Sequence, residues 1–251
     1  MVAAGAQPGL LFVGERGIGK SRLLDFVAQG ASQAGARILS ARCFEAEAVR
    51  PYGCWADALR AAIAAQGDPK LRRDLTLFAP PTDAPRGDEG SRTRLFAAVT
   101  SLLTCVCAKS PAVLMIDDPQ WIDEGSASLL HYVLRTVIAP NRLLFFGSAR
   151  TDEIVDNSWC RRVVGALVES GAVKRLQSSP LRAEDAAQFL EAGADAREVA
   201  DALRQTGGNP LFLTELARAG QQGIAASGRD LVALIDVRIA RLDDAARELI
   251  V

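Results

Sequence analysis

The sequence predicts an α/β fold in which a parallel sheet of about five strands is flanked by helices. Short apolar runs alternate with longer helical patterns, and this alternation is typical of parallel strands joined by crossover helices. The expected strands are Leu10–Val13, Arg37–Ala41, Val113–Ile116, Leu143–Gly147 and Val173–Leu176. The expected helices are Gly19–Gln29, Trp55–Ala65, Ser91–Ala108, Ser126–Val137 and Trp159–Glu169.

The chain changes character after about Ser179, where the strand signals stop and helical patterns continue. We therefore expect an α/β core over residues 1–178, a small helical lid over 179–224 and a further domain that begins at 225–251. Within the core, Ala79–Gly90 is rich in Pro, Asp and Gly and is predicted to be an exposed, mobile loop. The lid helices are expected at Ala183–Glu191, at Ala196–Gln205 and from Leu211 onward, before a linker at Gly220–Gly228.

The composition is that of an ordinary folded protein. Hydrophobic side chains make up 49% and charged side chains 24% of the 251 residues, which excludes general disorder. The formal net charge is −1, which argues against a chain that coats nucleic acid or an anionic membrane. Only four of the 29 basic residues are lysines, so each lysine is of interest: Lys20, Lys70, Lys109 and Lys174.

The sequence predicts a cytoplasmic protein. The first residues lack a basic signal-peptide region, and no apolar run reaches the ~18 residues of a membrane span. The five cysteines are odd in number and lack paired CxxC spacing, so we expect small buried thiols rather than zinc ligands. The single histidine, His131, lies in an expected helix and is interpreted as structural.

The strongest motif is a glycine-rich loop between the first expected strand and the first expected helix. Residues 14–21, GERGIGKS, match the pattern GxxxxGK[ST] in full. Glycines let backbone N–H groups converge on phosphate oxygens, and the following helix adds its positive N-terminal end. In this pattern Lys20 reaches the β- and γ-phosphates and the Ser21 hydroxyl binds Mg²⁺. The predicted phosphate-binding residues are Gly14, Glu15, Arg16, Gly17, Ile18, Gly19, Lys20, Ser21 and Arg22.

A pair of acidic residues follows the third expected strand. The apolar run Val113–Ile116 leads directly into Asp117 and Asp118, at the strand end where open α/β sheets bind ligands. About 100 residues after a phosphate loop, this pattern predicts that Asp117 holds Mg²⁺, usually through its water shell. Asp118 is then placed to orient or polarise the attacking water.

Two further segments are candidates for nucleotide sensing. Arg150 follows the fourth expected strand and could contact the γ-phosphate, although pairing with Asp152 or Glu153 is the simpler alternative. The second segment, Gly207–Pro210, separates two lid helices and could equally be a plain helix stop.

Together these segments resemble the nucleotide-binding module of the STAND class of P-loop NTPases. Within that class they are most similar to the AAA-like ATPase part of large ATP-binding LuxR-type transcriptional regulators. VLMIDDPQWIDEGSASLL resembles the extended Walker B segment of this group, with its Asp-Asp-x-Gln-Trp-x-Asp signature. The other similar segments are GERGIGKSRLL, RPYGCWADALR, LLFFGSARTDE, TGGNPLFLTEL and LVALIDVRIARLDDAARELI.

The resemblance implies a P-loop NTPase core, a helical lid and the start of a winged helix. It implies ATP or ADP and Mg²⁺ as cofactors, with Lys20, Asp118 and Arg150 in catalysis and Pro210 against the adenine. The family's Gly-Arg-Glu-rich segment, which helps to hold the adenine, has no match in the nine residues before Leu10. No DNA-reading helix-turn-helix follows within the chain.

The leading hypothesis is an ATP-binding regulatory switch with slow Mg²⁺-dependent hydrolysis. One alternative is a non-catalytic interaction module that uses Trp121 and the Ala79–Gly90 loop as partner surfaces. Another is an AAA+ ATPase that acts on DNA, with Arg161 or Arg162 supplied in trans. Apolar residues near the end of the chain, such as Leu249 and Ile250, predict self-association.

Overall fold

The computed structural model describes residues 9–78, 89–138, 142–190 and 194–221. The chain divides into two compact units, the first formed by Met1–Glu15 with Lys20–Gln177 and the second by Arg16–Gly19 with Ser178–Val251. Most of the Ala79–Gly90 loop, the Gly220–Gly228 linker and the expected winged-helix start lie outside the described residues.

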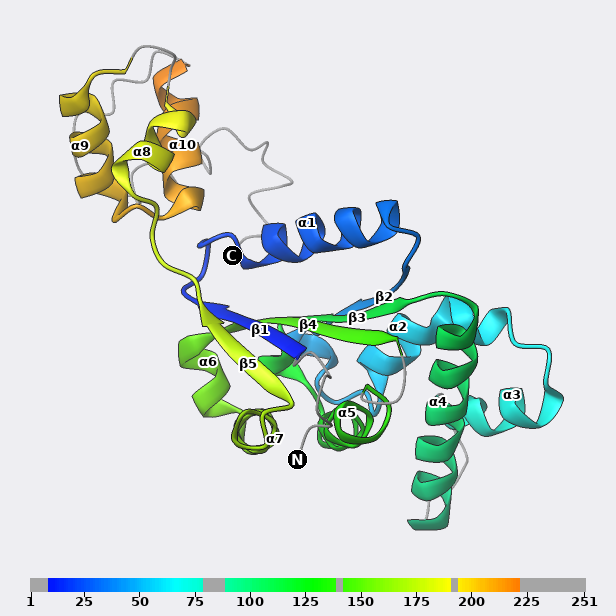
Figure 1. Ribbon diagram of the computed structural model, residues 1–251. Coiled ribbons are helices and arrows are strands. Elements are labelled where there is room, and N and C mark those ends of the chain that lie inside the picture. Colours follow the sequence, from blue (N-terminus) through cyan, green and yellow to red (C-terminus); the bar gives the residue numbers. More distant parts are fainter. Residues whose placement is uncertain (1–8, 79–88, 139–141, 191–193, 222–251) are drawn as a thin grey trace, which may run out of the picture. The chain divides into compact units, whose positions relative to one another are not determined.

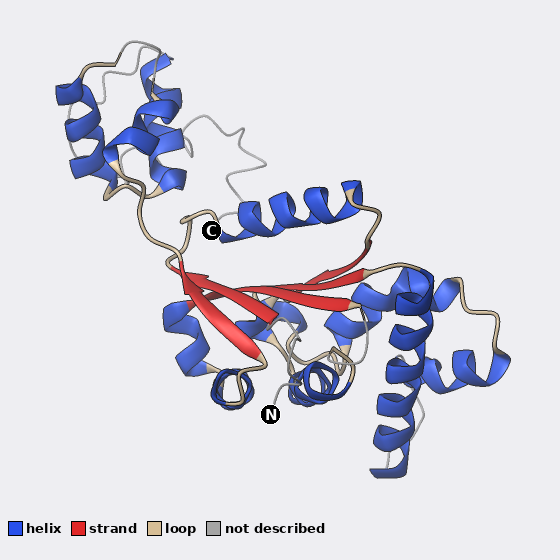
Figure 2. Cartoon of the chain, viewed as in Figure 1, coloured by secondary structure: helices blue, strands red, loops and turns tan. Residues whose placement is uncertain are grey.

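The first unit contains a parallel sheet of five strands in the order β2-β3-β4-β1-β5, which confirms the predicted fold class (Figure 2). β3 lies between β2 and β4 and runs as five apolar residues into an acid, with every residue before Asp117 buried. A strand buried on both faces requires such a continuous apolar run. The strands are β1 (Gly9–Gly14), β2 (Arg37–Arg42), β3 (Ala112–Asp117), β4 (Leu143–Arg150) and β5 (Val173–Gln177).

Helices cover both faces of this sheet. Figure 1 shows α1 along one face, where it contacts β1, β2, β3 and β4, and shows α2, α5 and α7 on the other face. The helices are α1 (Lys20–Gln33), α2 (Gly53–Ala64), α3 (Pro69–Leu75), α4 (Glu89–Lys109), α5 (Glu124–Thr136), α6 (Thr151–Asp156) and α7 (Ser158–Glu169). Short 3₁₀ turns occupy Glu45–Glu47, Thr76–Phe78 and Pro119–Trp121.

The two faces of β3 contribute to different cores. Val113 and Met115 pack with Leu24 of α1, where Phe12 and Phe146 stack beside them. Leu114 and Ile116 belong to the larger cluster on the opposite face. This alternation follows from the two-residue period of a strand, and it holds the end of β3 rigidly between two packed layers.

The second unit is helical in its described part. Its elements are α8 (Ala183–Ala186), a 3₁₀ turn (Ala187–Phe189), α9 (Ala196–Thr206) and α10 (Pro210–Gln221). Asp195 caps α9 in a capping box with Glu198, whose side chain accepts a hydrogen bond from the Asp195 amide. Ala186, Ala202 and Leu213 form its small apolar core.

Several expectations need correction. α3 and α6 were not expected, and α4 begins at Glu89, so the last two residues of the expected loop are helical. The helix expected over Ala183–Glu191 is instead one α-helical turn followed by a 3₁₀ turn. Cys105 is exposed, whereas the other four cysteines are buried as expected.

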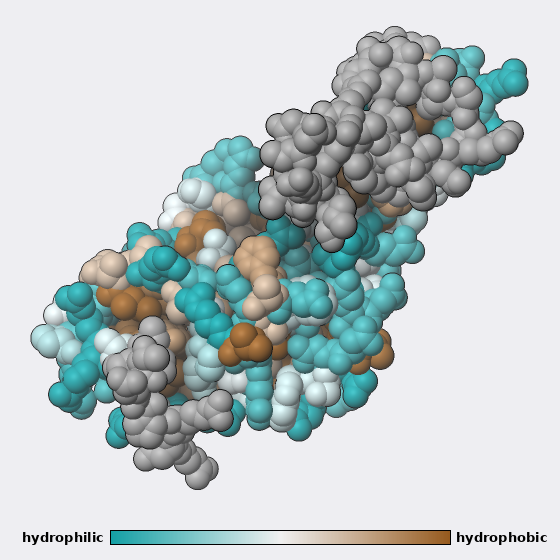
Figure 3. Space-filling view, turned by 180° about the vertical axis from the view of Figure 1, so that it is seen from behind, coloured by the Kyte–Doolittle hydropathy of each residue, from teal (hydrophilic) through white to brown (hydrophobic). Residues whose placement is uncertain are grey.

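The surface is mixed in character. On the face shown in Figure 3, polar side chains predominate and apolar ones occur in small groups. Val49 and Phe26 are the most exposed large apolar side chains among the described residues, at 89% and 75%. None of the described helices is both long enough and apolar enough to span a bilayer.

The buried contacts of α2 give a first prediction. Leu59 is fully buried, so we expect Leu59→Ala to lower the free energy of unfolding by about 2–5 kcal/mol through lost contacts and a residual cavity. The control Phe26→Ala removes an exposed side chain of α1 and should change it by less than about 0.5 kcal/mol. Urea denaturation followed by circular dichroism measures both, and equal losses would contradict the described packing.

Candidate nucleotide-binding site

The glycine-rich loop lies between β1 and α1, as predicted. Gly17 and Gly19 have φ angles of +80° and +98°, in the left-handed region where residues with a Cβ are strained. The first turn of α1 contains no acidic residue, so nothing on it offsets the positive end of the helix. This backbone is suited to an anion.

Lys20 is buried and points back into this loop. Its Nζ donates hydrogen bonds to the carbonyl oxygens of Gly14, at 3.0 Å, and Glu15, at 2.8 Å. Burial lowers the pKa of Lys20 below its ordinary value and Arg150 adds to this effect, whereas Asp118, Asp117 and Glu153 oppose it. Lys20 therefore lies near one cation, Arg150, and near several carboxylates.

Asp117 ends β3 and is bound by two serine hydroxyls. The Ser21 Oγ donates to its Oδ2 at 2.9 Å, and the Ser148 Oγ donates to its Oδ1. Within the described residues no group of three or more His, Cys, Asp or Glu side chains could hold a metal alone. The Ser21 hydroxyl and the Asp117 carboxylate fit a Mg²⁺ site in which water and phosphate oxygens supply the remaining ligands.

Asp118 follows with its backbone in the left-handed region, at φ 57° and ψ 46°. Its N–H donates to the Ser148 carbonyl at 2.9 Å, which fixes the turn. Its Oδ2 accepts from the Arg42 guanidinium, Nη2 at 3.0 Å and Nε at 3.2 Å, and its Oδ1 accepts from Gln120 Nε2 at 2.8 Å. Asp117 and Asp118 thus share Arg42, whose Nε also lies 3.7 Å from Asp117 Oδ2, whereas only Asp118 is bound by Gln120.

Arg150 ends β4 beside the same acids. Its Nη1 lies 2.6 Å from Glu153 Oε1, and its Nε lies 3.8 Å from Asp118 Oδ1. Its backbone N–H donates to Gln120 Oε1 at 3.3 Å. The pairing with Glu153 that the sequence offered as an alternative is therefore present, and it leaves Arg150 close to the predicted phosphate site.

Gln120 joins these groups from a fully buried position, with 1% of its surface exposed. Its Nε2 donates to both Asp118 Oδ1 and Glu153 Oε2, at 2.8 and 3.1 Å. Asn157 in turn fixes the backbone around Gln120, because its Nδ2 donates to the carbonyls of Gln120 and Ile122, at 2.9 and 3.0 Å. The acid pair and Arg150 are thereby connected through one amide side chain.

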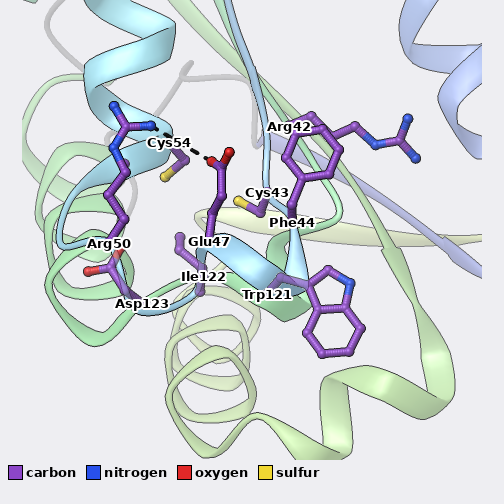
Figure 4. Close-up of a pocket in the computed structure, with 10 residues that line it drawn as sticks. Arg42, Cys43, Phe44, Glu47, Arg50, Cys54, Trp121, Ile122 and Asp123 are labelled. Atoms are coloured by element: carbon purple, nitrogen blue, oxygen red, sulfur yellow. Dashed lines mark ion pairs between the residues drawn. The ribbon is translucent and has the colours of Figure 1, made fainter. Parts of the chain in front are cut away.

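A pocket with an empty volume of about 250 Å³ adjoins the Asp118 turn (Figure 4). Its wall includes the thiols of Cys43 and Cys54 and the Trp121 ring, and the interaction with the Cys54 thiol, together with burial, raises the pKa of Cys43. Figure 4 shows the Arg42 guanidinium directed away from these thiols, in keeping with its hydrogen bonds to Asp118. The predicted phosphate-loop residues do not line this pocket.

Arg22 lies in α1 of the first unit, and the remaining predicted residues belong to the second unit. Arg16 and Gly17 belong to it, and the Asn209 Nδ2 donates to the Arg16 carbonyl at 2.9 Å. Pro210 begins α10, and Gly207 and Gly208 before it have positive φ angles, at 60° and 73°.

Sequence reasoning missed several residues of this site, each for want of a local signal. Arg42 and Ser148 lie at strand ends, and only strand register brings them to the acids. Gln120 was recognised as part of a signature without a role. Asn157 could have been found as a helix-cap residue before α7, since Asn is a favoured N-cap.

A phosphate loop after the first strand and an acid pair after β3, in a parallel sheet of this order, define a P-loop NTPase of the AAA-like kind. Residues 1–146 match the family model described as the AAA ATPase domain. The chain therefore belongs to the AAA ATPase domain family. No curated protein sequence matches it significantly.

Solved structures share the fold at low sequence identity. A STAND protein with a tetratricopeptide repeat sensor from Pyrococcus horikoshii is 15% identical, with a TM-score of 0.53 over 99% of this chain and 32% of that one. The ORC2 protein of Aeropyrum pernix is 15% identical, with a TM-score of 0.50 over 87% of this chain and 58% of that one. The chain thus spans about a third of the STAND protein.

The double role of Asn157 gives a second prediction. Its Oδ1 caps α7 by accepting from the amides of Trp159 and Cys160, while its Nδ2 binds the two carbonyls near Gln120. Asn157→Asp keeps the cap but loses both donated bonds, so it should lower the free energy of unfolding by about 1–3 kcal/mol. Asn157→Ala loses the cap as well and should cost about 1 kcal/mol more. Chemical denaturation compares them, and wild-type stability of Asn157→Asp would refute the assignment.

Proposed function

We propose that this chain is a nucleotide switch module that binds ATP and ADP with Mg²⁺ and hydrolyses ATP slowly. The observation that supports it is the convergence of Lys20, Ser21, Asp117, Asp118 and Arg150 at the carboxyl edge of one sheet. These residues come from three separate segments of the chain, and their side chains are the types that phosphoryl transfer requires.

Each side chain has a distinct role in this proposal. Lys20 turns from the loop carbonyls toward phosphate oxygens, exchanging two neutral acceptors for a charged one. Ser21 and Asp117 hold the Mg²⁺ side of the nucleotide. Bound Mg·ATP supplies the transferable γ-phosphoryl group and the metal charge. The carboxylate of Asp118 accepts a hydrogen bond from the attacking water and orients it.

Arg150 and the second unit supply the switch. A switch needs two nucleotides that differ in their preference between two states, and a cation that contacts only the γ-phosphate provides such a difference. In the proposed arrangement Pro210 rests against the adenine, and the lid over 179–224 responds to the nucleotide bound by the 1–178 core. Residues 225–251 would begin a winged helix.

The biological setting that the signature favours is regulatory. The Asp-Asp-x-Gln-Trp-x-Asp and GGNPLFL segments resemble those of LuxR-type regulators, in which a module of this kind controls further domains. The likeness to a STAND protein is compatible with this setting, since that protein carries a repeat sensor. We infer that the chain acts as the ATPase part of such a regulator.

Removal of the loop lysine tests nucleotide binding. Lys20→Ala deletes the buried ammonium group beside the loop and should weaken ATP and ADP binding at least about 100-fold, because a charge-assisted phosphate contact is lost. Isothermal titration calorimetry with Mg²⁺ measures both affinities. The control Lys109→Ala removes an exposed lysine at the end of α4 and should leave both unchanged. If Lys20→Ala binds ATP and ADP as tightly as the wild type, the proposal is wrong.

Hydrolysis is tested separately through Asp118. Asp118→Asn removes the acceptor charge at nearly constant volume, so phosphate release should fall at least about 100-fold while ATP affinity stays near the wild-type value. A coupled phosphate assay and calorimetry on the same samples provide the comparison. If the wild-type chain binds ATP but releases no phosphate, the proposed hydrolysis is wrong and the non-catalytic alternative is favoured.

A further inference from the structure

Glu153 is a carboxylate at this edge of the sheet to which the proposed function gives no role. It lies in the first turn of α6, and its Oε1 is 2.6 Å from Arg150 Nη1. Its Oε2 accepts from Gln120 Nε2 at 3.1 Å. Both carboxylate oxygens are therefore engaged, one by the proposed γ-phosphate sensor and one by the amide that also binds Asp118.

The position of this pair is well protected. The Arg150 and Glu153 side chains are 20% and 25% exposed, so solvent screens their attraction less than it would on an open surface. Glu153 is also close enough to Lys20 to raise its pKa, against the larger effect of burial. A γ-phosphate held by Lys20 would thus enter a region that already contains the negative charge of Glu153.

The five N–H donors of a guanidinium lie in one rigid plane, so a shift of Arg150 toward a new anion would weaken its present contact with Glu153. In this structure Glu153 holds the Nη1 of Arg150, so a γ-phosphate that recruits Arg150 would draw on a guanidinium that is already paired. ATP must therefore compete with Glu153 for Arg150, whereas ADP has no γ-phosphate and leaves the pair intact. The free energy needed to break the Arg150–Glu153 pair therefore weakens the binding of ATP and does not affect the binding of ADP.

We propose that Glu153 is a specificity-determining residue that sets the ATP-to-ADP preference of this site by competing with the γ-phosphate for Arg150. The inference rests on the proposed function, because it assigns Arg150 to the γ-phosphate. The competition also affects Asp118, because the Nε2 of Gln120 donates hydrogen bonds to both Glu153 and Asp118. Release of Glu153 frees that amide to bind Asp118 alone.

The test is calorimetric titration of Glu153→Gln with Mg²⁺ and either ADP or a non-hydrolysable ATP analogue. The substitution keeps the shape of the side chain but removes the charge that binds Arg150. We expect the analogue to bind about tenfold more tightly than to the wild type, the size of one charge-assisted hydrogen bond. ADP affinity should stay within about twofold.

Two comparison variants make the result specific. Asp152→Asn removes a neighbouring exposed charge from the same turn of α6 and should leave the ratio of the two affinities unchanged. In an Arg150→Gln background, Glu153→Gln should no longer tighten analogue binding, because the group under competition is gone.

The outcomes separate the two claims. Equal tightening of ADP and analogue, or no change in either, overturns the role of Glu153 and leaves nucleotide binding standing. Persistence of the tightening in the Arg150→Gln background also overturns it. A folded wild-type chain that binds neither nucleotide overturns the proposed function and this inference together.

Discussion

The register of the parallel strands is the constraint from which the site follows. Arg42 of β2 is level with Asp117 of β3, which is level with Ser148 of β4, and Gly14 of β1 is level with Arg150. Parallel strands end at a common edge, so this register sets a cation, an acid, a hydroxyl and the start of the phosphate loop side by side. A slip of one residue would reverse every side chain of the slipped strand.

The hydrophobic cores enforce that register. β3 places Val113 and Met115 under α1 and Leu114 and Ile116 in the larger cluster, so a slip of one residue would exchange side chains between two packed layers. The polar residues begin only where this apolar run ends. With the left-handed turn at Asp118 both neighbouring carboxylates lie near Arg42, whereas successive residues of a continued strand would point to opposite faces.

Cationic and acidic side chains are equal in number in the network at this edge. Three cations and three carboxylates lie within mutual reach: Lys20, Arg42, Arg150, Asp117, Asp118 and Glu153. Because the cluster is partly buried, an incoming polyphosphate must separate existing pairs before it gains new ones. A rearrangement of this kind is what the proposed switch function requires.

The sequence predicted the parts of this arrangement that have local signals. The five strands, the phosphate loop and the Asp117–Asp118 pair follow from apolar runs and glycine spacing. Arg42 meets Asp118 across 76 positions and Ser148 meets Asp117 across 31, so only the folded register could reveal them. α3 was missed although Asp68 caps it before Pro69, a signal that its seven residues make easy to overlook.

The residue type at position 120 follows from the same electrostatic argument. Its side chain must donate to two carboxylates and accept from the backbone N–H of Arg150. A glutamate would place a third negative charge between Asp118 and Glu153, and an apolar residue would leave both oxygens without this donor. Only an amide supplies two donors and an acceptor without charge. The Gln of the Asp-Asp-x-Gln signature is thus a physical requirement for holding Asp118 and Arg150 in one network.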